Sequence, residues 1–210
     1  MELAWAARVR YLLLVCAMVA CAVSAGTARA APGQAYVYDR LLGIVARTSL
    51  WQAASQDAPI SMRKVLRVYV RCYRDRGSFD RTFERRFGES ATRVVAYYVG
   101  GGDLHLRNGT CDSVRMFLRG RHTVYTAGAY AILLHEALHR QRVRNERITT
   151  CLANDAVRWG TLWHGFGEAK ALRARNLAFA YTRLFSPPGY YMGKPDCLAL
   201  TRRKDWQAFT

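Results

Sequence analysis

Residues 125–139 read Tyr-Thr-Ala-Gly-Ala-Tyr-Ala-Ile-Leu-Leu-His-Glu-Ala-Leu-His. The run is rich in alanine and leucine and apolar on nearly every side, which predicts a buried helix, and we expect Thr126 to cap it. On such a helix His135 and His139 project from one face, so both rings can bind one metal ion. Glu136 follows the first histidine, where it can reach a water on that ion and accept its proton. The stretch therefore predicts a metal site inside the fold.

A third ligand is expected, because catalytic zinc sites usually take three protein ligands and keep a fourth position for water. The best candidate is Glu146, in the segment Arg-Asn-Glu-Arg-Ile-Thr-Thr-Cys. On one continuous helix it would lie roughly 10.5 Å beyond His139 along the axis, which is too far to share an ion. We therefore expect the helix to end between Arg140 and Asn145, and a second helix, capped by Asn145, to carry Glu146 in its first turn. The competing role for Glu146 is an ion pair with nearby arginines.

The two segments together resemble the zincin metallopeptidases. His-Glu-Ala-Leu-His followed by Asn-Glu-Arg-Ile-Thr-Thr is most similar to the gluzincins, in which HExxH precedes a helix bearing Asn-Glu-x-x-Ser/Thr-Asp/Glu. The resemblance implies Zn²⁺ bound by His135, His139 and Glu146. It also implies hydrolysis of peptide bonds by a metal-activated water, with Glu136 as the general base. The stretch 135–151 is similar, too, to small exported actinobacterial HExxH proteins of uncharacterised function.

The chain departs from the gluzincin pattern in two places. The gap between the two segments is shorter, and Thr150 stands where an acid that orients a histidine is expected. Asp155, about one turn further along, is a candidate substitute for that acid. The metzincin pattern HExxHxxGxxH fits less well, because Arg142 and Asn145 replace its glycine and its last histidine. Two residues are kept as reserve metal ligands: His164 and Glu168.

Residues 1–30 have the pattern of a secretory signal peptide. Arginines precede an apolar segment at 11–24, and the Ala-Arg-Ala at 28–30 fits the small-residue cleavage pattern. Cleavage there leaves residues 31–210, which we expect to form a single secreted domain without a membrane segment. The alternatives are an uncleaved membrane anchor and a lipoprotein site at Cys21.

Cysteine usage agrees with export. Two of the six cysteines lie within the predicted signal peptide, which leaves Cys72, Cys111, Cys151 and Cys197. Four cysteines in an exported protein predict two disulfides, with three possible pairings. Free or metal-binding thiols are the competing interpretation, but the chain has no CxxC spacing to favour it.

The chain is strongly basic, with a net charge of +17. The predicted signal peptide holds three arginines and one glutamate, so the part after cleavage keeps +17 minus +2, or +15. This charge attracts anionic surfaces, but the basic residues are spread along the chain, so no specific nucleic-acid partner is expected. The leading hypothesis is a monomeric zinc peptidase with a peptide or protein substrate. The alternative is a non-catalytic secreted zinc-containing protein that binds anionic cell-surface polymers.

The remaining periodicity predicts an α+β domain, and the resemblance implies a zincin-like one, with a small β-sheet packed on the HExxH helix beside additional helices. Helices are expected at 36–47, 78–87 and 166–185, and strands at 62–73, 92–99 and 103–107. The last two strands are expected to pair as a hairpin across Gly100–Gly102. Segment 103–107, containing His105, is our candidate edge strand for binding substrate by strand addition. The tail from Tyr190 is expected to be irregular and held by Cys197.

Overall fold

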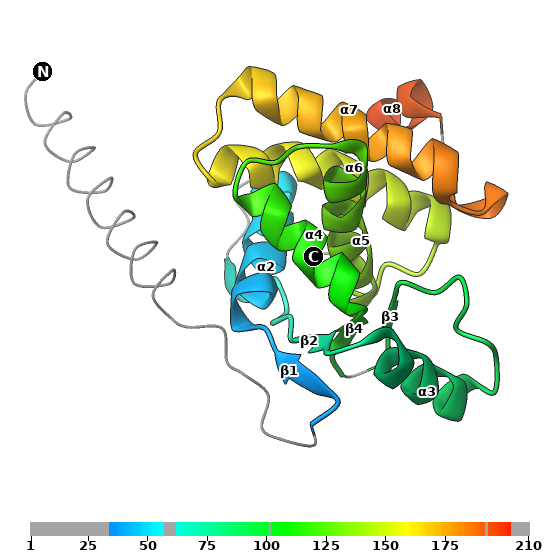
Figure 1. Ribbon diagram of the computed structural model, residues 1–210. Helices are drawn as coiled ribbons and strands as arrows, with labels where there is room; N and C mark the ends of the chain where they lie inside the picture. The colour runs from blue at the N-terminus through cyan, green and yellow to red at the C-terminus, as the bar shows by residue number, and fades with distance from the viewer. Residues whose placement is uncertain (1–33, 57–61, 101, 192, 203–210) are drawn as a thin grey trace, which may run out of the picture.

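The computed structural model describes residues 34–56, 62–100, 102–191 and 193–202, so the predicted signal peptide lies outside the described residues. These residues form an α+β fold in which a layer of helices lies against a small sheet (Figure 1). Within the described residues, no helix is both long and apolar enough to span a membrane.

The elements follow one another along the chain with short connections. The strands are β1 (Tyr36–Tyr38), β2 (Val70–Tyr73), β3 (Ala96–Tyr98) and β4 (Leu104–Leu106). The helices are α2 (Arg40–Ala54), α3 (Arg76–Phe87), α4 (Asn108–Leu118), α5 (Val124–Arg140), α6 (Glu146–Trp163), α7 (Glu168–Phe185) and α8 (Lys194–Arg202). Two short 3-10 helices are η1 (Met62–Lys64) and η2 (Pro188–Tyr190).

The four strands form one mixed sheet in the order β1-β2-β4-β3. β2 and β4 are parallel, whereas β1 pairs antiparallel with β2, and β3 pairs antiparallel with β4. The predicted hairpin is thus confirmed, but the predicted edge strand is wrong: β4 lies inside the sheet, and the terminal strands are β1 and β3. β4 lies inside the sheet because both of its faces are buried. Leu104 and Leu106 pack toward the helices, while His105 on the other face stacks on Tyr97 with ring centroids 4.5 Å apart.

Each face of the sheet has its own hydrophobic cluster. Toward α3, the aromatic rings of Tyr97 and Tyr73 pack with Phe79 and Phe83. The opposite face joins the main core, whose centre is α5. α5 packs against α2, α4, α6 and α7 and against strands β3 and β4. The predicted buried HExxH helix, with a sheet packed on it, is therefore confirmed.

Close packing between α5 and α7 depends on the glycine at position 128. A Cβ atom at Gly128 would lie 2.1 Å from the ring of Tyr181 on α7, which is inside van der Waals contact. On the other side of the helix, the hydroxyl of the fully buried Tyr130 contacts that of Ser49 on α2 at 2.6 Å. These contacts hold the helix that carries the histidines in a fixed position between its neighbours.

The N-terminal helix is shifted relative to the prediction at 36–47. The first residues of that segment form β1, and α2 begins at Arg40 because Asp39 caps it, its side chain accepting from the Leu42 N–H at 3.0 Å. The helix does not end at Thr48 and Ser49. Their hydroxyls donate to backbone carbonyls one turn earlier, and the helix continues to Ala54.

The ends of several other helices and strands differ from the predicted ones. Of the predicted strand 62–73, only β2 is a strand, and the predicted strand 92–99 shortens to β3. The predicted helix 78–87 starts earlier, at Arg76, because Asp75 caps it. Helix α4 was not predicted. The tail is not wholly irregular, because it contains α8.

Two disulfides tie distant elements together. Cys72–Cys111 joins β2 to α4, and Cys151–Cys197 joins α6 to α8. This confirms the predicted number of disulfides and selects one of the three pairings. The linked cysteines are separated by 39 and 46 residues. Closing such loops stabilises a fold by roughly 4 kcal/mol each, because it lowers the entropy of the unfolded chain. Structural disulfides are typical of proteins in an oxidising, extracellular environment.

Candidate metal centre

Helix α5 places the three predicted residues His135, Glu136 and His139 in its last two turns. The helix is capped by Thr123, not by Thr126 as expected. Thr123 accepts from the Thr126 N–H at 3.2 Å, and the Thr126 hydroxyl accepts from the Thr123 N–H at 2.9 Å, which together form a capping box. The helix therefore begins about one turn earlier than expected, because Thr123 forms this reciprocal pair with Thr126.

The turn after α5 closes without glycine. The Arg142 N–H donates to the His139 carbonyl at 2.9 Å, and the Val143 N–H donates to the Leu138 carbonyl at 3.1 Å. This is the Schellman arrangement, which needs one residue in the left-handed region and usually has glycine there. Here Arg142 takes that conformation, with φ 72°. The chain therefore reverses direction within the five residues available between the helices.

A buried glutamine anchors this turn. Gln141, 3% exposed, accepts from the Leu66 N–H at 2.8 Å and donates to the Leu66 carbonyl at 3.2 Å. The two bonds occupy both ends of the amide, so the turn is fixed to the segment that precedes β2. The position of the next helix relative to α5 is fixed with it.

Helix α6 begins as expected. Asn145 caps it by accepting from the Ile148 N–H at 3.0 Å, and Glu146 is its first residue. The two carboxylate oxygens of Glu146 face the two histidines: Oε2 lies 3.0 Å from His135 Nε2, and Oε1 lies 3.3 Å from His139 Nε2. The two Nε2 atoms are 3.0 Å apart. The turn thus brings all three predicted ligands together, with one ligand atom from each lying within 4.8 Å of the others.

The donor chemistry of this cluster fits a metal cation. His139 Nδ1 lies 2.7 Å from the Val143 carbonyl oxygen. A carbonyl only accepts, so Nδ1 carries a proton, and Nε2, which faces His135 and Glu146, is the ring atom available to bind a metal ion. Glu146 Oε2 is buried and has no hydrogen-bond partner among the described residues. Ligands about 2.1 Å from a tetrahedral ion are separated by roughly 3.4 Å, which is close to the separations found here.

Each histidine is oriented by a contact at Nδ1. For His139 the partner is the Val143 carbonyl, and for His135 it is the Thr150 hydroxyl at 3.1 Å. Thr150 therefore occupies the place where an acid was expected. Asp155 does not substitute for that acid, because it pairs with Arg175 at 3.3 Å. These contacts at Nδ1 leave the Nε2 atom of each ring directed at the cluster, where it can bind a metal ion.

The Glu136 carboxylate lies beside the cluster, under the terminal strand. The backbone N–H of Tyr98 on β3 donates to it. Burial, followed by the negative charge of Glu146, raises the pKa of Glu136 to about 8. Burial lowers the pKa of His135, and the side-chain contact with His135 lowers the pKa of Glu146.

Tyr190 also belongs to this site and was missed by the sequence analysis. Its ring, from η2, is nearly parallel to that of His135, with centroids 5.9 Å apart. Burial and the carboxylates of Glu146 and Glu136 raise its pKa. The sequence feature that could have indicated Tyr190 is Cys197. The disulfide between Cys151 and Cys197 holds α8 against α6, and the segment before α8, which contains η2, is thereby held near the first turns of α6.

The reserve ligands lie away from the centre. His164 follows the last residue of α6, and Glu146 is the first of that 18-residue helix, which places them roughly 27 Å apart. Glu168 forms an ion pair with Arg158. Both predictions for reserve ligands are therefore wrong, because α6 continues unbroken to Trp163.

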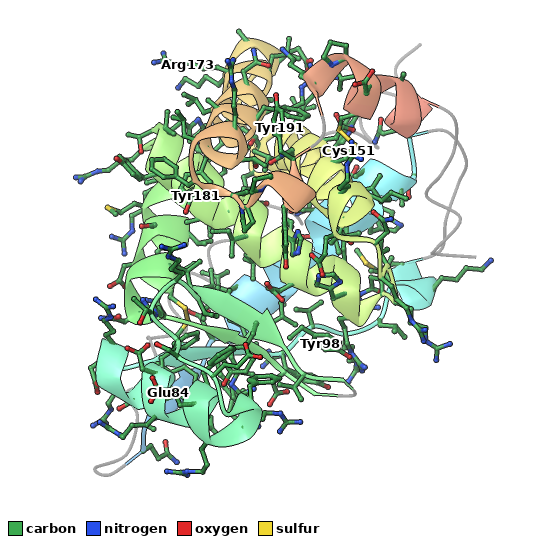
Figure 2. All side chains as sticks on the ribbon, turned by 90° about the vertical axis from the view of Figure 1, so that its right-hand side faces the viewer. Glu84, Tyr98, Cys151, Arg173, Tyr181 and Tyr191 are labelled. Atoms are coloured by element: carbon green, nitrogen blue, oxygen red, sulfur yellow. A yellow bond between two sulfur atoms is a disulfide. The ribbon has the colours of Figure 1, made fainter. Side chains whose placement is uncertain are left out.

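Two of the three ligands, His139 and Glu146, line an outward-facing pocket. It has a volume of about 690 Å³ and extends from His139 and Glu146 to Tyr98 at the end of β3. Figure 2 shows Tyr98 where the sheet meets the helical layer. A metal ion at this centre would thus be reachable by a solute. No family model, curated protein or solved structure matches the chain.

Proposed function

We propose that this protein is a secreted zinc-dependent peptidase with a zincin-like arrangement of helix and sheet. The observation that carries the proposal is the convergence of His135, His139 and Glu146 with Glu136 at their side. Two imidazoles and one carboxylate are a ligand set typical of catalytic zinc, and three protein ligands leave a fourth position open. A structural zinc site would instead be expected to have four protein ligands.

The proposed chemistry divides between the ion and the protein. His135, His139 and Glu146 would hold the zinc, which would supply a Lewis acid for the scissile carbonyl and would lower the pKa of water. The Glu136 carboxylate accepts a proton from the attacking water and then delivers it to the leaving amine nitrogen. The Tyr98 N–H holds this carboxylate in place, and the Nδ1 contacts of both histidines hold the rings.

The terminal strand β3 supports a peptide as the substrate. It lies at the edge of the sheet, contacts α5, and ends at Tyr98 beside the pocket. An extended peptide lying along this edge would add one strand to the sheet and pass the ligand cluster. Substrate binding by strand addition, predicted for 103–107, is therefore proposed for the edge strand β3.

The test is Glu136→Gln, which removes the base but none of the three ligands. We expect the variant to keep one zinc per chain, measured by elemental analysis, and to lose at least about 100-fold in kcat/KM on a quenched fluorescent peptide library. Glu89→Gln, an exposed position outside the site, is the matched control and should be as active as wild type. Equal peptide cleavage by the Glu136 variant and wild type would show that the assigned role is wrong. Zinc binding without any cleavage by wild type would favour the non-catalytic alternative.

A further inference from the structure

The pocket beside the metal centre has a wall of arginines. The turn between α5 and α6 contributes Arg140, Arg142 and Arg144, while the other side carries His139, Glu146 and Tyr98. All three arginines line the same pocket, as does Val143 between two of them. Because this turn also sets the position of Glu146, the positive wall and the ligand cluster are parts of one local structure.

Among the described residues, no acid forms an ion pair with the arginines of this wall. Glu146 is the one acid that lines the pocket, and its carboxylate faces the two histidines. Arg142 and Arg144 are exposed and form no ion pair with any described residue. Some arginines elsewhere in the fold pair with acids, as Arg115 does with Asp39 at 2.6 Å. Others, such as Arg85, are exposed without an ion pair among the described residues, so the distinguishing feature of Arg142 and Arg144 is their place beside the ligand cluster.

Backbone conformation gives a second, independent observation. Arg142 is the one non-glycine residue with a positive φ in the described part of the chain. An L-residue in this region costs free energy that glycine would not, and such strain is concentrated at functional sites. The strained residue here carries a cationic side chain into the pocket next to the metal ligands.

From these observations we propose that Arg142 and Arg144 form a subsite for a carboxylate of a bound peptide. A guanidinium group presents two parallel N–H donors that match the two oxygens of a carboxylate. The carboxylate can belong to an acidic side chain or to the C-terminus of the peptide. This subsite rests on the proposed peptidase function and defines its substrate class as peptides with a negative charge close to the cleaved bond.

The experiment measures binding, so that it is separate from catalysis. Zinc-loaded full chain with Glu136→Gln is titrated against fluorescein-labelled hexapeptides, and Kd is read by fluorescence anisotropy at low salt. The first peptide has a central glutamate and an amidated end. The second replaces that glutamate with glutamine, and the third keeps the glutamine but has a free C-terminal carboxylate.

We expect the glutamate peptide or the free-carboxylate peptide to bind about tenfold more tightly than the neutral one, as for two exposed charge-assisted contacts. Tighter binding of the glutamate peptide would identify a side-chain carboxylate as the ligand, and tighter binding of the free-carboxylate peptide would identify the C-terminus. When Arg142→Gln and Arg144→Gln are added to the Glu136→Gln chain, the charged and neutral peptides should bind with the same Kd. The control is Arg85→Gln with Arg173→Gln, which removes the same charge from exposed positions on α3 and α7. This control should still bind the charged peptide more tightly than the neutral one. Figure 2 shows Arg173 far from Tyr98.

Three results would overturn the subsite: equal Kd values for charged and neutral peptides, an equal loss of discrimination in the control, or no binding of any peptide. A subsite that discriminates in a protein whose wild type cleaves nothing would instead contradict the peptidase function alone. The failures of the two proposals are therefore distinguishable.

Discussion

Replacing Arg142 with glycine should make the protein more stable while weakening its affinity for acidic peptides. Arg142 has φ 72°, and an L-residue in the left-handed region costs roughly 1–2 kcal/mol. Glycine relieves that cost but makes the unfolded chain more flexible, which offsets roughly 0.5–1 kcal/mol. The net gain in the free energy of unfolding is about 0.5–1 kcal/mol, or roughly 1–4 °C in Tm for a domain of this size.

The assay is thermal unfolding followed by circular dichroism, with two matched variants. Arg144→Gly removes the same side chain two residues away, where φ is not positive, and should lower stability. Arg142→Ala removes the charge but keeps the strained backbone, so it should not raise Tm. If Arg142→Gly melts below wild type, or if the two glycine variants shift Tm equally, the inferred strain at this turn is wrong.

Two further predictions concern the histidines. Thr150→Val removes the hydroxyl that contacts His135 Nδ1 and should weaken zinc binding roughly 10- to 100-fold in a chelator competition, whereas Thr48→Val on α2 should not. Burial lowers the pKa of His105 from 6.5 to about 4. The unfolded chain therefore binds more protons than the fold between these values, and the free energy of unfolding should fall by up to about 3 kcal/mol as the pH drops from 6.5 to 4. Urea unfolding across this range should show a smaller pH dependence for His105→Gln, and an identical dependence in both proteins would contradict this assignment.

The parts of the site that could be predicted are those determined locally. The apolar run before His135 predicts a buried helix, and the two histidines four residues apart require a common face. The distance from His139 to Glu146 requires a break in the helix, and Asn145 gives the cap of the next one. These inferences need no knowledge of the remaining chain, and the structure places the residues accordingly.

The parts that could not be predicted depend on contacts between distant segments. Strand order decides whether 103–107 or β3 is the edge, and both segments have similar patterns. Tyr190 reaches His135 through a disulfide pairing that the sequence leaves open. Helix α4 begins at Asn108 without a side-chain cap, so no start signal marks it. The turn has Arg142 where glycine is usual, and its anchor is the contact of Gln141 with the distant Leu66, which no local signal reveals.

The central claim is that Glu146 completes a three-ligand zinc site with His135 and His139. The most direct test is the zinc affinity of Glu146→Gln, which keeps the shape of the side chain but removes its charge, measured by competition with a chromophoric chelator. We expect wild type to bind one zinc per chain and the variant to bind it at least about 100-fold more weakly. Absence of zinc binding by wild type, or equal affinity in the variant, would contradict the claim.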